Sequence, residues 1–269
     1  MKTRGLTFLS LAICIVHIIP FYILITSSFK KADDYSSSWS VPGYVFLDNF
    51  TNAWEHANLG RVFFNNIVIT ALAVILLVLL GSIASYPLAR YPTKFNKKIY
   101  VIFVSALIVP PLSILVPLYN IMVDMGGMNT FWGVILLHVT FQLPITIFFY
   151  TGFISTIPRE LDEAAMLDGA GRAELFFRII MPLLKPVTSS SIIITGVWIW
   201  NDYQFSVFFL QSSKVHNITV ALSQFFAQYN SNIGWVAAGA LLGMLPMVAV
   251  FLFLQKYFIQ GLSSGAVKG

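Results

Sequence analysis

A group of polar side chains lies within an apolar stretch near residue 200 and could bind a ligand rich in hydroxyl groups. An amide beside a carboxylate offers hydrogen-bond donors and acceptors, and an indole ring can stack on the apolar face of a sugar. Because polar groups are costly inside lipid, we expect them to line a substrate path. The candidates are Trp198, Trp200, Asn201, Asp202 and Gln204, with a second group of His138, Thr140 and Gln142 in an earlier apolar stretch.

Two other roles stay open for the same residues. Asn201 and Gln204 could instead hydrogen-bond between helices, and the tryptophans could belong to the aromatic belt at a membrane surface. The sequence does not decide between these roles and a substrate path.

Catalytic and metal chemistry have no comparable group in this chain. The histidines are dispersed, and the single cysteine, Cys14, lies in an apolar run, so neither a metal cluster nor a disulfide framework is indicated. No G-x-x-x-x-G-K-[ST] phosphate loop occurs. We therefore expect no catalytic residue, no metal and no cofactor here; any ATP with Mg²⁺ would be bound by a separate subunit.

A polar segment, 158–186, interrupts the apolar chain and contains five of its eleven acidic residues. A helix can begin after its first proline, because its first turns would carry Glu160, Asp162 and Glu163, where the helix dipole favours negative charge. Gly169 is typical of a helix end.

A second helix is predicted to begin near Gly171. It would present one apolar face, formed by Leu175, Phe176, Ile179 and Ile180. The two helices would form an amphipathic hairpin on a membrane surface, and the small pair Ala164 and Ala165 would let another protein approach the first helix closely. An interfacial loop without a partner is the alternative.

The rest of the chain must position these two features in a membrane. With 57% hydrophobic and 10% charged residues and a mean hydropathy of +0.79, the 269-residue chain has more apolar surface than a soluble fold could bury. The predicted fold is an all-α polytopic membrane protein with a single transmembrane domain over residues 1–269. Its six transmembrane helices are expected at about 6–29, 62–88, 99–123, 131–153, 187–210 and 235–258. The first run is read as an uncleaved helix, because it is long and lacks the cleavage site of a signal peptide.

Lysine and arginine placement predicts the orientation. With both termini on one side, that side receives twelve of the 16 basic residues, and the other receives only Lys30, Lys31, Arg61 and Lys214. The positive-inside rule then places both termini, the loop 154–186 and the tail 259–269 in the cytoplasm. The basic residues form no stripe with interleaved aromatics, so a nucleic-acid partner is not expected.

The spacing within the polar segment resembles a known family. Glu163-Ala164-Ala165, three residues, Gly169, nine residues, Ile179, one residue and Met181-Pro182 resemble the EAA loop of permease subunits of binding-protein-dependent ABC importers; Met181 stands where that family usually has Leu. In that family the loop is a coupling helix that docks into a cleft of the ATPase subunit. The resemblance implies that coupling involves Glu163, Ala164, Ala165, Asp168, Gly169, Arg172 and Pro182.

Shorter stretches resemble the carbohydrate-uptake branch, in particular its maltose-type permeases. They include Ser85 to Arg90, Trp200-Asn201 and the ending Gly265 to Gly269; Pro87 and Asp202 depart from the usual Ala and Glu. The resemblance implies import of a sugar or oligosaccharide in the cell membrane of a bacterium or archaeon. It also implies four kinds of partner besides lipid: a second, homologous permease, two ABC ATPase subunits, an extracytoplasmic solute-binding protein and the sugar itself. A secondary, ion-coupled carrier is the alternative, although it would be expected to carry paired ionisable residues at the midplane.

Overall fold

The computed structural model describes residues 2–230 and 232–266, and all regular structure in that part of the chain is helical. This confirms the predicted all-α membrane fold. The chain divides into two compact units. One contains the chain up to Phe64 together with Ile218–Pro246, and the other contains Asn65–Asn217 together with the chain from Met247 onward.

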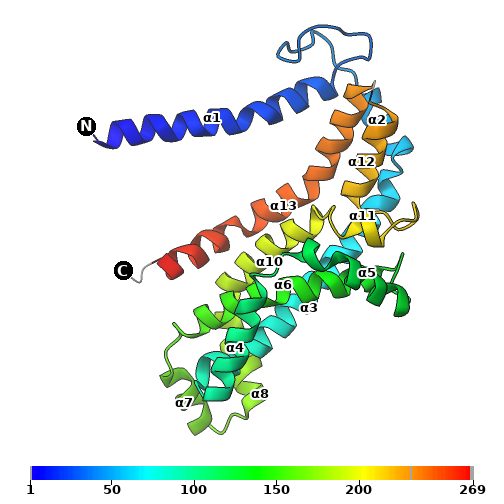
Figure 1. The fold of residues 1–269 in the computed structure, drawn as a ribbon. Helices are drawn as coiled ribbons and strands as arrows, with labels where there is room; N and C mark the ends of the chain where they lie inside the picture. The colour runs from blue at the N-terminus through cyan, green and yellow to red at the C-terminus, as the bar shows by residue number, and fades with distance from the viewer. Residues whose placement is uncertain (1, 231, 267–269) are drawn as a thin grey trace. The chain divides into compact units, whose positions relative to one another are not determined.

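The first unit is built from α1 (Lys2–Ser28), α2 (Asp48–His56), the start of α3 (Leu59–Arg90), α12 (Ile218–Gln228) and the first half of α13 (Ile233–Ala266) (Figure 1). Its core contains Ala53, Leu59, Phe225 and Ala238. The buried amide of Asn49 donates to the carbonyls of Ser28 and Lys30, which ties α2 to the end of α1. The sequence predicted neither α2 nor α12, because both are short helices within connections between spans.

The second unit holds both candidate sites. After α3 it contains α4 (Lys94–Ala106), η1 (Pro111–Ile114), α5 (Leu115–Asp124), α6 (Phe131–Ile154), α7 (Glu160–Leu167), α8 (Arg172–Glu174), η2 (Leu175–Ile180), α9 (Met181–Leu183), α10 (Lys185–Trp200) and α11 (Ser206–Phe209). One core joins α3, α6 and α10 through residues such as Leu77, Val134 and Ile199. A second core, with Tyr150, Phe176 and Leu184, lies where the hairpin of α7 to α9 meets the long helices.

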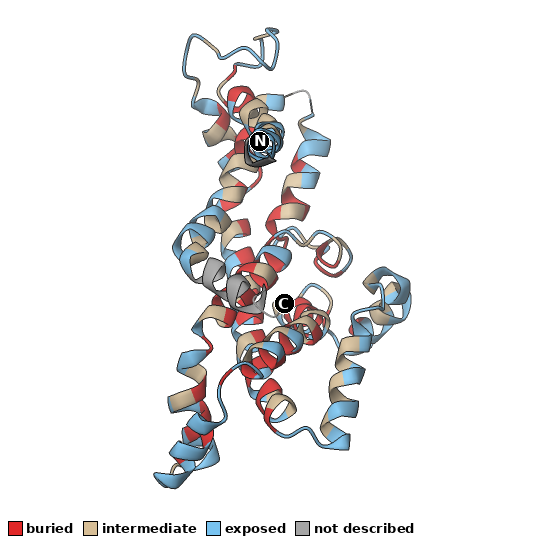
Figure 2. Ribbon diagram, turned by 90° about the vertical axis from the view of Figure 1, so that its left-hand side faces the viewer, coloured by how far each residue is buried: buried red, intermediate tan, exposed pale blue. Residues whose placement is uncertain are grey.

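Close packing holds α3 against α6. A side chain at Gly81 would overlap the Thr146 methyl group, and the Ser85 hydroxyl donates to the Ile147 carbonyl at 3.1 Å. Figure 2 shows that buried residues recur along the packed helices between exposed ones, whereas α1 is exposed along most of its length.

Within the described residues, four helices are long and apolar enough to cross a membrane: Gly5–Ser28, Leu59–Arg90, Phe131–Ile154 and Ile233–Lys256. Two bent helix pairs raise the number to six if each pair is one span: Lys94–Ala106 with Pro111–Asp124, bent by 91°, and Arg172–Leu183 with Lys185–Trp200, bent by 72°. Six spans therefore remain compatible with the structure.

Three helix boundaries differ from the predicted segments. The span at 99–123 is not continuous, because the helix stops at Ala106 and restarts at Pro111, where consecutive prolines cannot continue its hydrogen bonds. The span at 187–210 ends at Trp200, and a non-helical turn follows. The last helix continues to Ala266, so most of the predicted tail 259–269 is helical; its final three residues lie outside the described part.

Candidate functional site

The hairpin in the second unit has a sharply defined first helix. α7 ends at Leu167, and Gly169 adopts a left-handed conformation with φ +87°. Its N–H donates to the Met166 carbonyl at 3.1 Å, and the N–H of Ala170 donates to the Ala165 carbonyl at 3.0 Å. These two bonds form a Schellman motif, which accounts for the predicted helix end at this glycine.

The outer face of the hairpin carries most of the residues implied by the EAA resemblance. Those exposed are Glu163, Ala164, Asp168, Gly169 and Arg172. Beside them lie three apolar side chains that the sequence analysis did not single out, Leu161, Met166 and Leu167, with exposed fractions of 41%, 52% and 89%. The sequence signal that could have identified these three residues is the presence of apolar side chains on the exposed side of an acidic helix. The outer face of α7 therefore combines negative charge with exposed apolar surface.

Two residues of the predicted coupling set lie elsewhere. Ala165 is only 5% exposed and belongs to the core below the hairpin, so its side chain does not share the exposed face with Ala164. The two residues are one position apart, a rotation of about 100° around the helix, and a role of Ala165 in coupling stays a prediction. Pro182 is the second residue of α9, close to the 72° bend that leads into α10.

The inner face of α7 is tied to the end of α3 by a buried ion pair. Nε of Arg90 lies 2.8 Å from Oδ2 of Asp162, and Nη2 donates to Oδ1 at 3.2 Å. The two side chains are 4% and 10% exposed. The hydroxyl of Tyr86 also donates to this carboxylate at 3.2 Å, and Nη1 of Arg90 donates to the Ile157 carbonyl at 2.8 Å. The sequence predicted Asp162 only as a helix-start acid.

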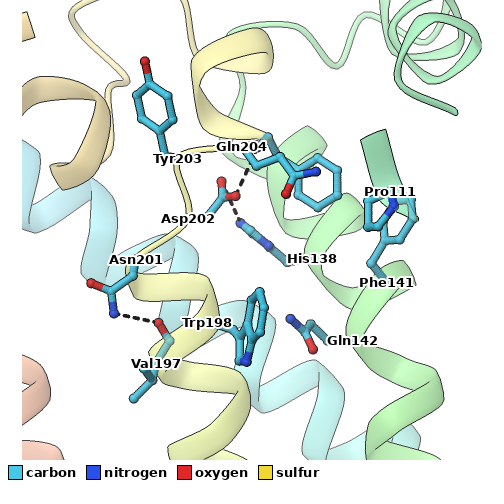
Figure 3. A pocket seen from close by; sticks show the side chains of 11 residues that line it. Pro111, His138, Phe141, Gln142, Val197, Trp198, Asn201, Asp202, Tyr203 and Gln204 are labelled. Carbon is cyan, nitrogen blue, oxygen red and sulfur yellow. Dashed lines mark hydrogen bonds and ion pairs between the residues drawn. The ribbon is translucent and has the colours of Figure 1, made fainter. Parts of the chain in front are cut away.

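A cavity of about 490 Å³ lies at the other candidate site, where α10 ends. Figure 3 shows side chains from α6, from the last turn of α10 and from the turn after it around this cavity, with Pro111 at one side. Of the candidate path residues, Gln142, Trp198, Asn201, Asp202 and Gln204 line it. His138 lines it too, whereas Thr140 does not, and the Thr140 hydroxyl donates to the Leu136 carbonyl.

The turn after α10 is held by its own polar side chains. The carboxylate of Asp202 accepts hydrogen bonds from the N–H groups of Phe205 and Ser206 at 3.0 and 2.9 Å, and from the Ser206 hydroxyl at 2.7 Å. Its side chain is 8% exposed, and its backbone carbonyl accepts a bond from the Asn217 amide. Asp202 therefore shapes the cavity wall, whereas the sequence analysis expected it to offer acceptors to a ligand.

The two tryptophans of the motif differ in environment. Trp198 is 67% exposed and turns its indole toward the cavity beside Gln142 (Figure 3). Trp200 is 3% exposed and packs in the core. Of these two tryptophans, Trp198 is the one that could stack on a ligand in the cavity. The amide of Asn201 donates to the Val197 carbonyl at 2.8 Å, which extends the end of α10.

No three His, Cys, Asp or Glu side chains within 2–230 and 232–266 are grouped so that they could hold a metal ion. The chemistry available at the cavity is therefore hydrogen bonding by amides and stacking by aromatic rings. At the hairpin, a charged and apolar surface is exposed and available for contact with another molecule.

The fold and the two sites define a polytopic helical membrane protein that has, in one helical unit, a hairpin with an exposed charged and apolar face and a cavity lined in part by polar side chains. Residues 78–264 match the family described as "Binding-protein-dependent transport system inner membrane component", and the chain belongs to this family.

Several named relatives of the chain are permeases of sugar transport systems. It is 52% identical to the melibiose/raffinose/stachyose import permease protein MelC of Bacillus subtilis (strain 168), over 99% of this chain and 97% of that protein. It is 31% identical to AmyC of Thermoanaerobacterium thermosulfurigenes, a probable starch degradation products transport system permease, over 98% and 96% of the two chains.

Solved structures share the fold. A chain of a bacterial ABC transporter involved in the import of the acidic polysaccharide alginate superposes with a TM-score of 0.84, at 17% identity and over 96% of this chain and 97% of that one. A chain of the alginate transporter in complex with a pentasaccharide-bound periplasmic protein superposes with a TM-score of 0.67, at 15% identity, over 94% and 93%.

Proposed function

We propose that this chain is the transmembrane permease subunit of an ATP-driven importer for a sugar or oligosaccharide. The observation that carries the proposal is the hairpin, whose exposed face presents Glu163, Ala164 and Gly169 in the spacing of the EAA loop. Its exposed Leu167 adds apolar surface that a partner could bury. The family, binding-protein-dependent transport, supports the same reading over a secondary carrier.

The chain would act as one part of a larger assembly. Its partners would be a second homologous permease, two ABC ATPase subunits and an extracytoplasmic solute-binding protein. The ATPase subunits would bind ATP with Mg²⁺ and hydrolyse it, so this subunit would be non-catalytic and need no cofactor of its own. It would lie in the cell membrane with both termini and the hairpin in the cytoplasm, as the basic residues predict.

The cavity would form part of the substrate path. Gln142 and Gln204 offer amide groups to hydroxyls, and Trp198 offers a ring face to the apolar side of a sugar. The likeness to MelC supports an α-galactoside such as raffinose as the substrate.

Co-purification from its natural host tests the coupling role. A tagged wild-type chain is expected to co-purify with a P-loop ATPase and a second permease. Cells that contain it are expected to import radiolabelled raffinose more rapidly than maltotriose. Leu167→Asp should lose the ATPase without loss of folded protein, because this side chain is 89% exposed. The control is Tyr35→Asp, a change at a 94% exposed side chain outside the hairpin that should retain the ATPase. A wild-type chain that purifies alone and does not hydrolyse ATP would contradict the proposal.

A further inference from the structure

The end of α3 contacts both arms of the hairpin. Arg90 and Tyr86 both contact the carboxylate of Asp162 on α7, as described above. The Tyr86 ring also packs edge-on against Phe176 in the second arm, with ring centroids 5.6 Å apart. The last turn of α3 and the hairpin thus share a buried polar and aromatic contact.

Proline makes this contact more important for α3 itself. Pro87 lies inside the helix and has no N–H, so one helical hydrogen bond is missing near its end. The missing bond would join Pro87 to the carbonyl of Ile83, and Tyr86 and Arg90, on either side of the proline in sequence, both bind the same carboxylate. Asp162 therefore holds the last turn of α3, which has one helical bond fewer to the rest of the helix.

The opposite end of the same helix, within the second unit, is anchored to the cavity wall. The Asn66 amide donates to the Trp200 carbonyl at 3.2 Å, at the residue where α10 ends. The neighbouring Asn65 amide donates to the carbonyls of Lys214 and His216 at 3.1 and 3.0 Å. Asn65 and Asn66 are both buried, with exposed fractions of 2% and 1%. The 24 residue steps from Asn66 to Arg90, at about 1.5 Å each, span about 36 Å.

We propose that α3 transmits movement between hairpin and cavity, with Arg90–Asp162 as the joint at the hairpin and Asn66 as the joint at the cavity wall. The inference rests on the proposed function, since it describes how docking of an ATPase on the hairpin would reach the substrate path. A displacement of α7 pulls on α3 through a buried ion pair that cannot be broken without leaving a charge unpaired. The packed helix then shifts the carbonyl of Trp200 and the turn that lines the cavity.

The test uses the complete complex in proteoliposomes with its binding protein and radiolabelled raffinose. Arg90→Met with Asp162→Leu removes both charges together, which avoids an unpaired buried charge. This double variant should assemble and hydrolyse ATP, while raffinose imported per ATP falls about tenfold, within the range seen when residues that couple two sites are changed. The matched control is Glu174→Leu with Arg178→Met, which removes an ion pair on the same hairpin whose side chains are 44% and 77% exposed. Its transport per ATP should not change.

A second variant addresses the far joint. Asn66→Leu leaves the hairpin intact and should also lower transport per ATP, which a purely structural role of Arg90 in the hairpin would not predict. It also decides the matter if the double variant fails to assemble. The inference would be overturned if the variants that assemble transport as much raffinose per ATP as the wild type, or if they lose ATP hydrolysis and transport equally. The proposed function would still stand in that case, provided that the wild-type complex couples ATP hydrolysis to transport. A wild-type chain without an ATPase would overturn both.

Discussion

Nε2 of His138 lies 3.7 Å from Oδ2 of Asp202, so a buried pair links α6 to the turn that follows α10. The two members of the pair are unequal. The carboxylate also accepts three hydrogen bonds from Phe205 and Ser206, whereas Nε2 of His138 has no hydrogen-bond partner in the described chain. The turn therefore depends on the aspartate more than on the histidine.

Asp202→Leu should consequently destabilise the protein more than His138→Leu. Loss of the carboxylate leaves two backbone N–H groups unpaired, at about 1–3 kcal/mol each if they stay buried. His138→Leu leaves those bonds in place and should cost roughly 1 kcal/mol. Thermal unfolding in detergent compares the two variants. The opposite order would mean that the histidine, and not the aspartate, supports the turn.

The two neighbouring tryptophans should separate substrate binding from folding. Trp198→Ala removes a 67% exposed ring at the cavity and should raise the apparent KM for raffinose about tenfold, equivalent to about 1.4 kcal/mol, with little change in Tm. Trp200→Ala empties a core position that is 3% exposed and should cost about 3–5 kcal/mol of stability. Uptake kinetics and thermal unfolding are the measurements. An unchanged KM in Trp198→Ala would remove this residue from the substrate path.

Gly81 and Gly152 provide a matched pair for the packing of α3 on α6. An added methyl group at Gly81 would overlap Thr146, so Gly81→Ala should destabilise by about 1–3 kcal/mol. Gly152 lies on α6 with open space around it, and Gly152→Ala should be neutral or stabilise by up to about 1 kcal/mol. If both variants unfold at the wild-type Tm, the close approach of the two helices is wrong.

The hairpin was largely predictable because its signals are local. Acidic residues at a helix start and a glycine at its end lie within a few residues of each other, and the structure has α7 with a Schellman motif at Gly169. The side of the helix on which each residue lies was less predictable from the sequence. Ala165 turned inward because a core from α3 and the second arm lies beneath it, and that core is invisible to spacing alone.

The joints and breaks depend on the tertiary structure. The sequence predicts Arg90 only as one of several cytoplasmic charges. In the fold it contacts Asp162, 72 positions later in the chain. Hydropathy likewise extends a span through 201–210, because it averages over a turn that the Asp202 side chain stabilises locally. The cavity residues were identified from their type, but their grouping required α6 and α10 to meet.

The helix end at Gly169 makes a direct prediction for the hairpin. Gly169→Ala forces an alanine into φ +87°, at a cost of roughly 1–2 kcal/mol for a left-handed residue with a Cβ. Nothing crowds the site, so strain is the only penalty. The control is Gly171→Ala two positions later, where φ is −71° and the space is also open. Hydrogen exchange at the N–H groups of Gly169 and Ala170 should accelerate only in the first variant; equal protection in both would contradict the motif.

The non-helical segment after α1 should respond to acid through Asp34. Hydrogen bonds from Ser36, first through its side chain, and from the Tyr44 hydroxyl lower the pKa of this carboxyl from 3.8 to about 2. Because the folded pKa is the lower one, the stabilisation is complete above pH 3.8 and is lost as the pH falls towards 2.

Carbon-13 NMR of aspartate-labelled protein would follow the titration of Asp34 directly. Ser36→Ala should raise its pKa most, because the Ser36 side chain makes the largest contribution, and Tyr44→Phe should raise it less. A wild-type Asp34 that titrates near 3.8 would show that these bonds do not persist, and the segment between α1 and α2 would then lack the hydrogen bonds that fold it onto itself.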